Sequence, residues 1–114
     1  MTDLQIEAML SEMHSGKRVL VVTPNDHITL RLFEKIGKSG GWTDGDQIRY
    51  TSGSLNIQSF ESGGWVRFIG IGNAGFGRGL TVDVIEFYPG TPDEVRAALM
   101  PCLAGSPDPK VIEL

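Results

Sequence analysis

The sequence predicts one α/β domain of three layers, with a mixed, mostly parallel sheet of about five to six strands, three helices and one β-hairpin. Three observations predict this fold. The run Val19–Val22 is wholly apolar, as in strands that are covered on both faces. Segments with helical and with strand periodicity alternate along the chain, which is typical of crossover units. A length of 114 residues suits a single core and excludes a two-domain enzyme.

The N-terminal segment 3–15 is expected to be an amphipathic helix that begins with a capping box, Thr2 followed by Gln5. Its apolar positions recur at i, i+3, i+4 and i+7, and they are Ile6, Met9, Leu10 and Met13. These side chains need a surface to cover, which is either the chain's own sheet or a partner. They are therefore the candidate interface residues, although base rates favour the chain's own core.

Two further helices carry start and stop signals. Asn25 is suited to cap a helix that runs to about Ile36, and Gly37 suits the left-handed position after the last turn. The stretch 91–94 combines a threonine cap, a proline in the first helical position and a glutamate three residues after the cap. It predicts a helix that ends near residues 101–103.

The remaining strands follow from alternation or from short apolar runs. Residues 48–50 and 55–57 alternate in hydrophobicity around a tight turn and predict the hairpin. Further strands are expected at 65–71, at 82–88 and, as a short last strand, at 111–112. The whole chain, 1–114, is expected to form one domain, with the helix 3–15 preceding a core of residues 17–114.

Charge and cysteine content exclude several classes of protein. Ten basic and fourteen acidic side chains give a net charge of −4, which argues against strong, nonspecific nucleic-acid binding. The single cysteine, Cys102, cannot form an internal disulfide. No apolar stretch approaches the ~20 residues of a membrane span, and the acidic N-terminus does not have the pattern of a signal peptide. We expect a cytoplasmic protein without a membrane partner.

Three glycine motifs lack the structural setting that their chemistry needs. Residues 37–39 end like a phosphate-binding loop, but they follow a helix, and Leu32 stands where the first glycine belongs. Residues 37–41 fit a nucleophile elbow in the reverse structural order. Residues 70–75 fit the dinucleotide fingerprint after a strand, but no helix is predicted to follow. We therefore expect no cofactor, while noting that such a loop lies at the sheet edge where ligands bind.

Catalytic and metal sites are not expected. Asp83 and Glu86 are three residues apart on a strand and point to opposite faces, so they cannot act as a carboxylate pair. His14, His27 and Cys102 belong to three different elements without ligand spacing. Cys102 is most simply a core residue.

Together, several segments resemble the large terminase subunit, the ATPase that packages DNA into phage heads. Residues 78–85 resemble the stretch that leads into its Walker B strand, and 17–25 resemble its second core strand with the start of the next helix. Residues 52–57 are similar to its hairpin, and residues 98–104 and 109–112 to the helix and the strand of its coupling motif. The resemblance covers residues 17–113 and implies a partial RecA-like, P-loop NTPase-type core.

The departures from that family concern its catalytic parts. The resemblance places Tyr88 and Pro89 at the acidic pair that organises Mg²⁺ and the attacking water, and Glu86 lies too far back to replace it. A helix stands where the phosphate-binding loop is expected, and the nuclease domain is missing. Without these groups ATP hydrolysis is not expected.

Three hypotheses about function follow. The first is a phage-type, noncatalytic remnant that binds a protein partner or itself as a homo-oligomer, in a regulatory role. The second is an accessory protein that binds a nucleotide, or weakly a nucleic acid, through the glycine-rich loop 70–79, with Trp65, Phe68 and Phe76 as stacking faces. Its candidate binding residues are Arg67, Phe76, Arg78 and Gly79. The third, a small enzyme of unknown type, has the least support because no base, nucleophile and orienting group converge.

Overall fold

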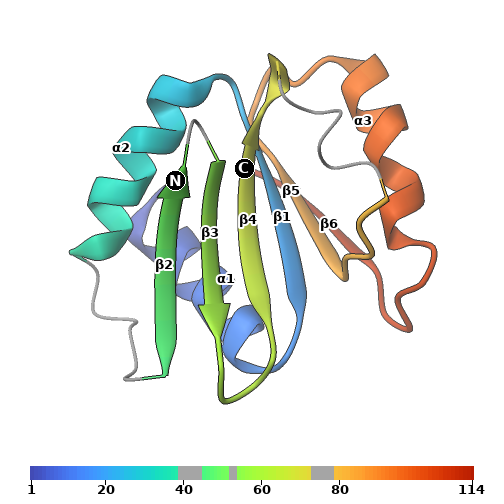
Figure 1. Cartoon of the computed structure of the whole chain (residues 1–114). Helices are drawn as coiled ribbons and strands as arrows, with labels where there is room; N and C mark the ends of the chain where they lie inside the picture. The colour runs from blue at the N-terminus through green and yellow to red at the C-terminus, as the bar shows by residue number, and fades with distance from the viewer. Residues whose placement is uncertain (39–44, 52–53, 73–78) are drawn as a thin grey trace.

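Six strands form one sheet in the order β2-β3-β4-β1-β5-β6, with helices on both sides (Figure 1). The computed structural model describes residues 1–38, 45–51, 54–72 and 79–114. The elements in chain order are α1 (Asp3–His14), β1 (Arg18–Thr23), α2 (Asp26–Gly37), β2 (Asp46–Thr51), β3 (Ser54–Ser59), β4 (Trp65–Gly70), β5 (Val84–Phe87), α3 (Asp93–Leu99), the 3-10 helix η2 (Met100–Leu103) and β6 (Lys110–Glu113).

The sheet is mixed and mostly parallel, as predicted. Strands β4, β1, β5 and β6 are parallel neighbours. Strands β2 and β3 form the expected antiparallel hairpin, and β3 pairs with β4 in antiparallel orientation. The bounds of the strands differ from the expected segments by at most two residues.

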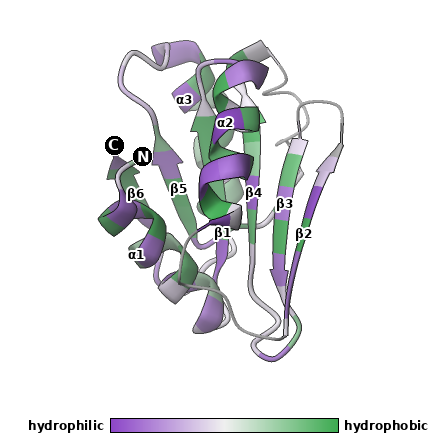
Figure 2. Ribbon diagram, turned by 90° about the vertical axis from the view of Figure 1, so that its left-hand side faces the viewer, coloured by the Kyte–Doolittle hydropathy of each residue, from purple (hydrophilic) through white to green (hydrophobic). Residues whose placement is uncertain are grey.

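Two hydrophobic clusters lie on opposite faces of the sheet and make the fold three-layered. On the first face, α1 and α2 cover the strands, which are mostly apolar beneath α2 (Figure 2). On the second face, α3 and η2 cover mainly β1 and β5. The central strand β1 contributes Val19 and Val21 to the first cluster and Leu20 and Val22 to the second. The apolar run in this strand therefore has the double burial that the sequence predicts.

Helix α1 belongs to the chain's own core. The capping box is present, since the amide of Gln5 donates to Thr2 Oγ1 at 3.1 Å and the amide of Thr2 donates to Gln5 Oε1 at 2.8 Å. The four residues considered for an interface are at most 1% exposed; they are Ile6, Met9, Leu10 and Met13. These side chains therefore cover the chain's own sheet and not the surface of a partner. The candidate interface is corrected accordingly, because side chains packed on the sheet offer no surface to a partner.

The ends of α2 were predicted in part. The side chain of Asn25 caps the helix and accepts from the amide of Ile28 at 2.9 Å. Gly37, however, is the last helical residue and does not have a positive φ. The prediction of a left-handed glycine was wrong because Lys38 ends the helix in the right-handed region, with its amide directed at the carbonyls of Ile36 and Lys35.

The start of α3 lies one residue later than predicted. Pro92 occupies the cap position, with no side-chain hydrogen bond, in place of Thr91. The Thr91 hydroxyl instead donates to the carbonyl of Tyr88 at 2.7 Å and closes the turn after β5. The helical path ends where expected, because α3 continues as η2 to Leu103. No helix among the described residues is long and apolar enough to cross a membrane.

At Gly64, before β4, the backbone passes close to the end of α1 and the start of β1, which gives a test of the fold. A Cβ atom there would lie 2.1 Å from the carbonyl oxygen of Met13 and 2.7 Å from that of Lys17. We expect Gly64→Ala to lower the free energy of unfolding by at least about 3 kcal/mol, because backbone atoms must move. The urea midpoint measures this. Gly37→Ala is the control, since its Cβ meets nothing within 4 Å; equal stability of the two variants would contradict the packing described.

Candidate functional site

The carboxyl ends of the parallel strands form the edge of the sheet where a ligand site is expected. In open α/β sheets, ligands bind where neighbouring strands send their connections to opposite faces. Here β1 leads into α2 on the first face and β5 leads into α3 on the second. The switch point therefore lies between the ends of β1 and β5.

At this edge, hydroxyl groups bond to one another and to the backbone. The Thr23 and Thr29 hydroxyl oxygens are 2.7 Å apart, and that of Thr23 donates to the carbonyl of Ile69 at 3.2 Å. Both threonines are fully buried. Beyond β5 stand the half-buried Tyr88 and the exposed Pro89. These groups fix the start of α2 and the turn after β5, and none of them is a carboxylate that ligates a cation.

The glycine motifs take structural positions where they are described. Gly37 ends α2, so residues 37–39 follow a helix as expected; residues 39–41 lie outside the described residues. Gly70 ends β4, and a Cβ there would lie 3.1 Å from Asp26 Oδ1, so the glycine lets β4 approach the start of α2. Residues 73–78 lie outside the described residues.

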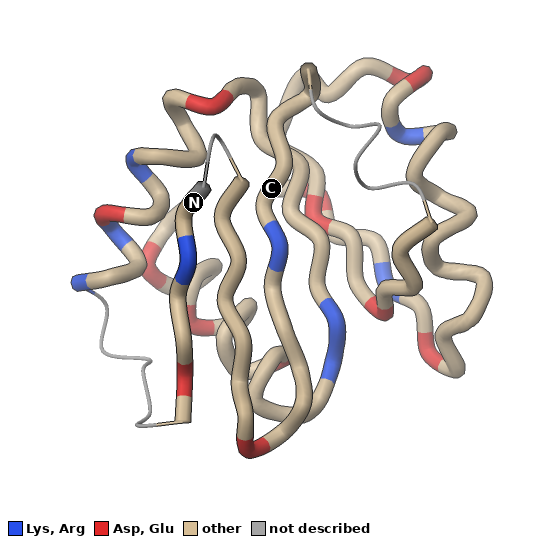
Figure 3. Tube along the Cα trace, viewed as in Figure 1, with Lys and Arg blue, Asp and Glu red and all other residues tan. Residues whose placement is uncertain are grey.

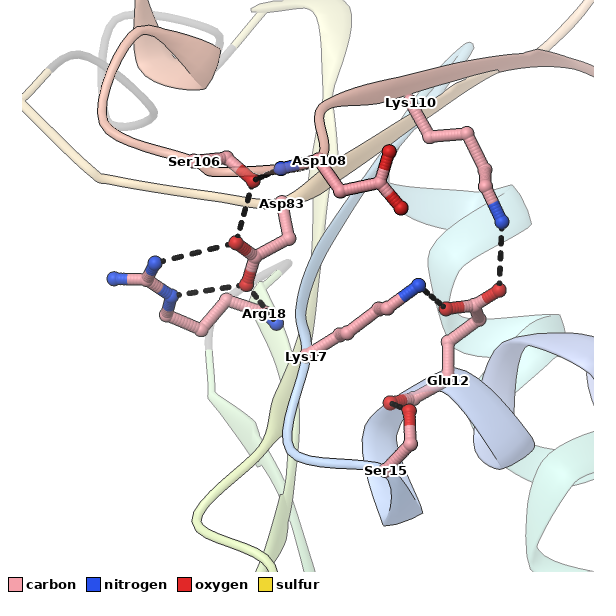
Figure 4. A network of polar contacts seen from close by, with 8 residues as sticks. All are labelled: Glu12, Ser15, Lys17, Arg18, Asp83, Ser106, Asp108 and Lys110. Atoms are coloured by element: carbon pink, nitrogen blue, oxygen red, sulfur yellow. Dashed lines mark hydrogen bonds and ion pairs between the residues drawn. The ribbon is translucent and has the colours of Figure 1, made fainter.

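Asp83 organises the opposite, amino edge of the sheet (Figure 4). Its carboxylate accepts from the Arg18 amide at 2.9 Å, from Arg18 Nε at 3.2 Å and Nη2 at 3.3 Å, and from Ser106 Oγ at 2.8 Å. Burial acts to raise the pKa of Asp83, but these hydrogen bonds outweigh it and lower the pKa from 3.8 to about 2. The carboxylate is therefore charged and held at the start of β1 and β5.

A second ion-pair group lies beside this carboxylate in Figure 4. Glu12 of α1 pairs with Lys17 at 2.9 Å and with Lys110 of β6 at 3.1 Å. The hydrogen bond from Lys17 is the main reason that the pKa of Glu12 is lowered. A cavity of about 350 Å³ adjoins the two groups, and its lining mixes both signs of charge. Because these charges already pair with one another, the network joins α1 to the sheet and is not proposed as a ligand site.

Glu86 points to the first face, whereas Asp83 precedes β5 and its carboxylate is held by Arg18 and Ser106 at the amino edge of the sheet. Glu86 pairs across the sheet with Val21 and Ile112 and is 3% exposed. Burial, with a smaller contribution from the charge of Glu12, raises the pKa of Glu86 from 4.5 to about 7. The side chain is therefore a buried acid that is partly protonated near neutral pH.

One part of the sheet has no helix over it. On the second face of β2 and β3, no described helix covers the strands (Figure 1), whereas Ile69 and Trp65 of β4 contact the cluster beneath α3 and η2. The register places Arg49, Asn56 and Arg67 in one row across the three strands. A second row holds Gln47, Gln58 and Trp65. We call these six residues the open face.

A hollow of about 230 Å³ lies in the open face, lined by Gln47, Arg49, Asn56, Gln58 and Arg67. Arg67 Nε donates to Asn56 Oδ1 at 2.7 Å. The Arg67 guanidinium carbon lies 5.1 Å from the centroid of the Trp65 ring, a cation–π contact. Arg49 is exposed and forms no ion pair with a described residue. The hollow therefore offers hydrogen-bond donors, acceptors and positive charge.

The candidate binding residues are not all brought together. Arg67 lines the hollow, whereas Gly79, with a φ of +82°, lines another cavity, of about 290 Å³, beside η2. Phe76 and Arg78 lie outside the described residues. Phe68 is fully buried on the first face, so the expectation that it offers a stacking surface was wrong.

Sequence reasoning missed Gln47, Arg49, Asn56 and Gln58. The alternation in the hairpin could have indicated them, because these polar residues alternate with the apolar residues that predict the core face. The hairpin pattern alone does not show that the opposite face of these strands lacks a helix.

The histidines and the cysteine do not form a site. His14 Nε2 lies 2.8 Å from Asp46 Oδ2, whose side chain is fully buried, and this pair joins α1 to β2. His27 is exposed, and Cys102 is a buried residue of η2. Among the described residues, no three His, Cys, Asp or Glu side chains are grouped to hold a metal ion.

The Asp83 carboxylate is testable through pH. Its pKa is about 2 in the folded chain against an ordinary 3.8, so its stabilisation is present above pH 3.8 and is lost as the pH falls towards 2. We expect Asp83→Asn to cost about 2 kcal/mol at pH 7, with the difference from the parent chain shrinking in that acid window. Urea titrations over this pH range measure it. Asp108→Asn, a change of an exposed neighbour, is the control; a pH-independent difference would refute the assignment.

The raised pKa of Glu86 predicts the opposite pH dependence of folding stability. Because its pKa is raised from 4.5 to about 7 by folding, the contribution of Glu86 to stability is most favourable below pH 4.5 and falls as the pH rises to 7. Glu86→Gln removes this loss and is expected to stabilise the chain at pH 8 by about 3 kcal/mol, but not at pH 4. Thermal unfolding at the two pH values compares the variants. Exposed Glu7→Gln serves as control, and the account fails if Glu86→Gln gives no gain at pH 8.

Comparison with known proteins supports the fold alone. No family model matches the sequence, and no curated protein matches it. The large terminase ATPase domain of Thermus phage P74-26 is similar in structure, with a TM-score of 0.62 and 14% identity over 98% of this chain and 55% of that one. An arginine-to-alanine mutant of that domain gives the same values.

A large terminase of a thermophilic bacteriophage, solved in complex with ADP, has a TM-score of 0.59 and 10% identity, over 96% of this chain and 29% of that one. The chain thus spans about half the length of the terminase ATPase domain that it matches. It has the RecA-like fold of large terminase ATPase domains.

Proposed function

We propose that the chain is a noncatalytic, terminase-ATPase-like module that acts in a regulatory role by binding another macromolecule. The observation that carries this proposal is the composition of the carboxyl edge. Tyr88 and Pro89 follow β5, at the positions where the resemblance places the acidic pair of the ATPase. A phenol and a pyrrolidine ring supply neither a magnesium ligand nor a group to orient water.

The groups after β1 support the same proposal. Thr23, Asn25 and Thr29 direct their side chains to backbone groups or to one another at the start of α2. A phosphate cradle instead requires backbone amides of a glycine-rich loop that converge between a strand and a helix. Loss of single groups of this kind lowers the rate of phosphoryl transfer by roughly 10² to 10⁵.

The open face supports a binding role. Its hollow is lined by polar side chains that include two arginines, and no described helix covers β2 and β3 on this side. Arg67 is one of the binding residues that the sequence predicts. The face also favours the second hypothesis, a nucleic-acid ligand, over a protein partner, because its hollow lacks an apolar anchor. In this form of the second hypothesis, the ligand contacts the open face of the sheet and not only the loop 70–79.

Self-association stays a prediction. The methionine-containing stripe of α1 is buried and does not support it. The exposed large hydrophobic residues of the described chain lie on separate elements, namely Leu4, Leu30, Phe60, Met100 and Val111.

Calorimetry with ATP tests the noncatalytic role. We expect no saturable heat when ATP is titrated into the chain with Mg²⁺, and the same trace with EDTA as control, because no described residues form a magnesium or phosphate cradle. A phosphate-release assay on the same sample should give the background rate. Tight, magnesium-dependent uptake or turnover above background would refute the proposed function.

A further inference from the structure

We propose that the open face binds a single strand of nucleic acid, with Arg49 and Arg67 holding its backbone and bases and the hollow between them taking one base. This inference rests on the proposed binding role. It assigns to β2, β3 and β4 a ligand surface that is separate from the carboxyl edge of the sheet.

Charge complementarity is the first argument. The chain has a net charge of −4, yet the open face holds two arginines and no carboxylate. Asp46, the acidic residue of β2, is directed at His14 on the other face. In Figure 3 the basic segments of β2 and β4 lie at similar height with β3 between them. Because neighbouring strands are about 4.8 Å apart, the two arginine positions are separated by roughly 10 Å. A flexible polyanion can contact both arginines at this separation.

The shape and lining of the hollow are the second argument. Its volume of about 230 Å³ is below the range of roughly 300–1,000 Å³ of drug-sized pockets, and it suits one small planar group. Gln47, Asn56 and Gln58 carry amides, which donate and accept hydrogen bonds as base edges do. An unpaired base presents its Watson–Crick edge to a protein, whereas in a duplex the partner base occupies that edge.

Arg67 supplies the third argument because its guanidinium is already oriented. One side of the group is fixed by the bond from Nε to Asn56 Oδ1 at 2.7 Å, and the guanidinium lies over the Trp65 ring. Bases stack on guanidinium planes as well as on aromatic rings. A plane that is held before binding loses little conformational entropy when a base stacks on it.

These features disfavour two other macromolecules. A protein partner usually inserts apolar or aromatic anchors into a dry pocket, but the hollow is lined by hydrogen-bonding side chains only. A duplex is held mainly by many phosphate contacts, and the open face has two arginines for them.

Fluorescence anisotropy with a fluorescein-labelled single-stranded deoxythymidine oligomer tests the proposal. With two phosphates neutralised, the logarithm of the affinity should fall against the logarithm of salt concentration with a slope of about −1.4. Arg49→Gln should weaken binding about five-fold or more and reduce the slope by about 0.7. Arg31→Gln is the matched control, because it removes the same charge from an exposed position on α2, away from the open face.

Two further comparisons separate stacking from charge. Arg67→Lys keeps the charge but loses the planar group, so it should also weaken binding, with circular dichroism reporting that it is folded. A polyglutamate peptide and the corresponding duplex should compete less well than the unlabelled single strand. Equal competition by polyglutamate or duplex, an equal loss in Arg31→Gln and Arg49→Gln, or unchanged affinity in folded Arg67→Lys would overturn the proposal.

The outcome is distinguishable from that of the proposed function. If neither the oligomer nor magnesium–ATP binds, the nucleic-acid inference fails while the noncatalytic role stands. If magnesium–ATP is bound or hydrolysed, the proposed function itself fails.

Discussion

The carboxylate of Asp83 is the constraint on which the parallel part of the sheet depends. The Asp83 side chain is 13% exposed, and its carboxylate accepts from the amide and guanidinium of Arg18 and from the hydroxyl of Ser106. Its backbone also bonds to Arg18 and Lys110, so one residue joins the starts of β1, β5 and β6. Desolvation of a charge is offset only when such bonds are made, which is why loss of this charge is expected to loosen three strands at once.

The layers then determine where a ligand can lie. The first face is filled by α1 and α2, and the second face over β1 and β5 by α3 and η2. At the carboxyl edge, the hydroxyl groups bond to one another or to the backbone. At the amino edge, the charged side chains pair with each other. Within the described part of the chain, the strands β2 and β3 retain a face without a helix, and that face, with Arg67 of β4 beside it, carries polar side chains. This face is the surface for which we propose ligand binding, away from the carboxyl edge of the sheet.

Local patterns were sufficient for most elements of the fold. The apolar run in β1, the capping box of α1 and the alternation of the hairpin predict structure because each depends on neighbouring residues. The Thr91 cap was misplaced because its hydroxyl bonds to Tyr88, a competition that the sequence pattern does not reveal. Contacts between distant residues could not be predicted at all.

The open face and the Asp83 network both consist of such distant contacts. Arg18 and Asp83 are 65 positions apart, and the row of Arg49, Asn56 and Arg67 exists only once the register of three strands is set. A ¹⁵N NMR titration tests the central claim, that binding has moved from the carboxyl edge to the sheet face. We predict that the single-stranded oligomer shifts the amide signals of β2, β3 and β4, while magnesium–ATP leaves the spectrum unchanged. Shifts induced by magnesium–ATP around Thr23 and Tyr88 would contradict it.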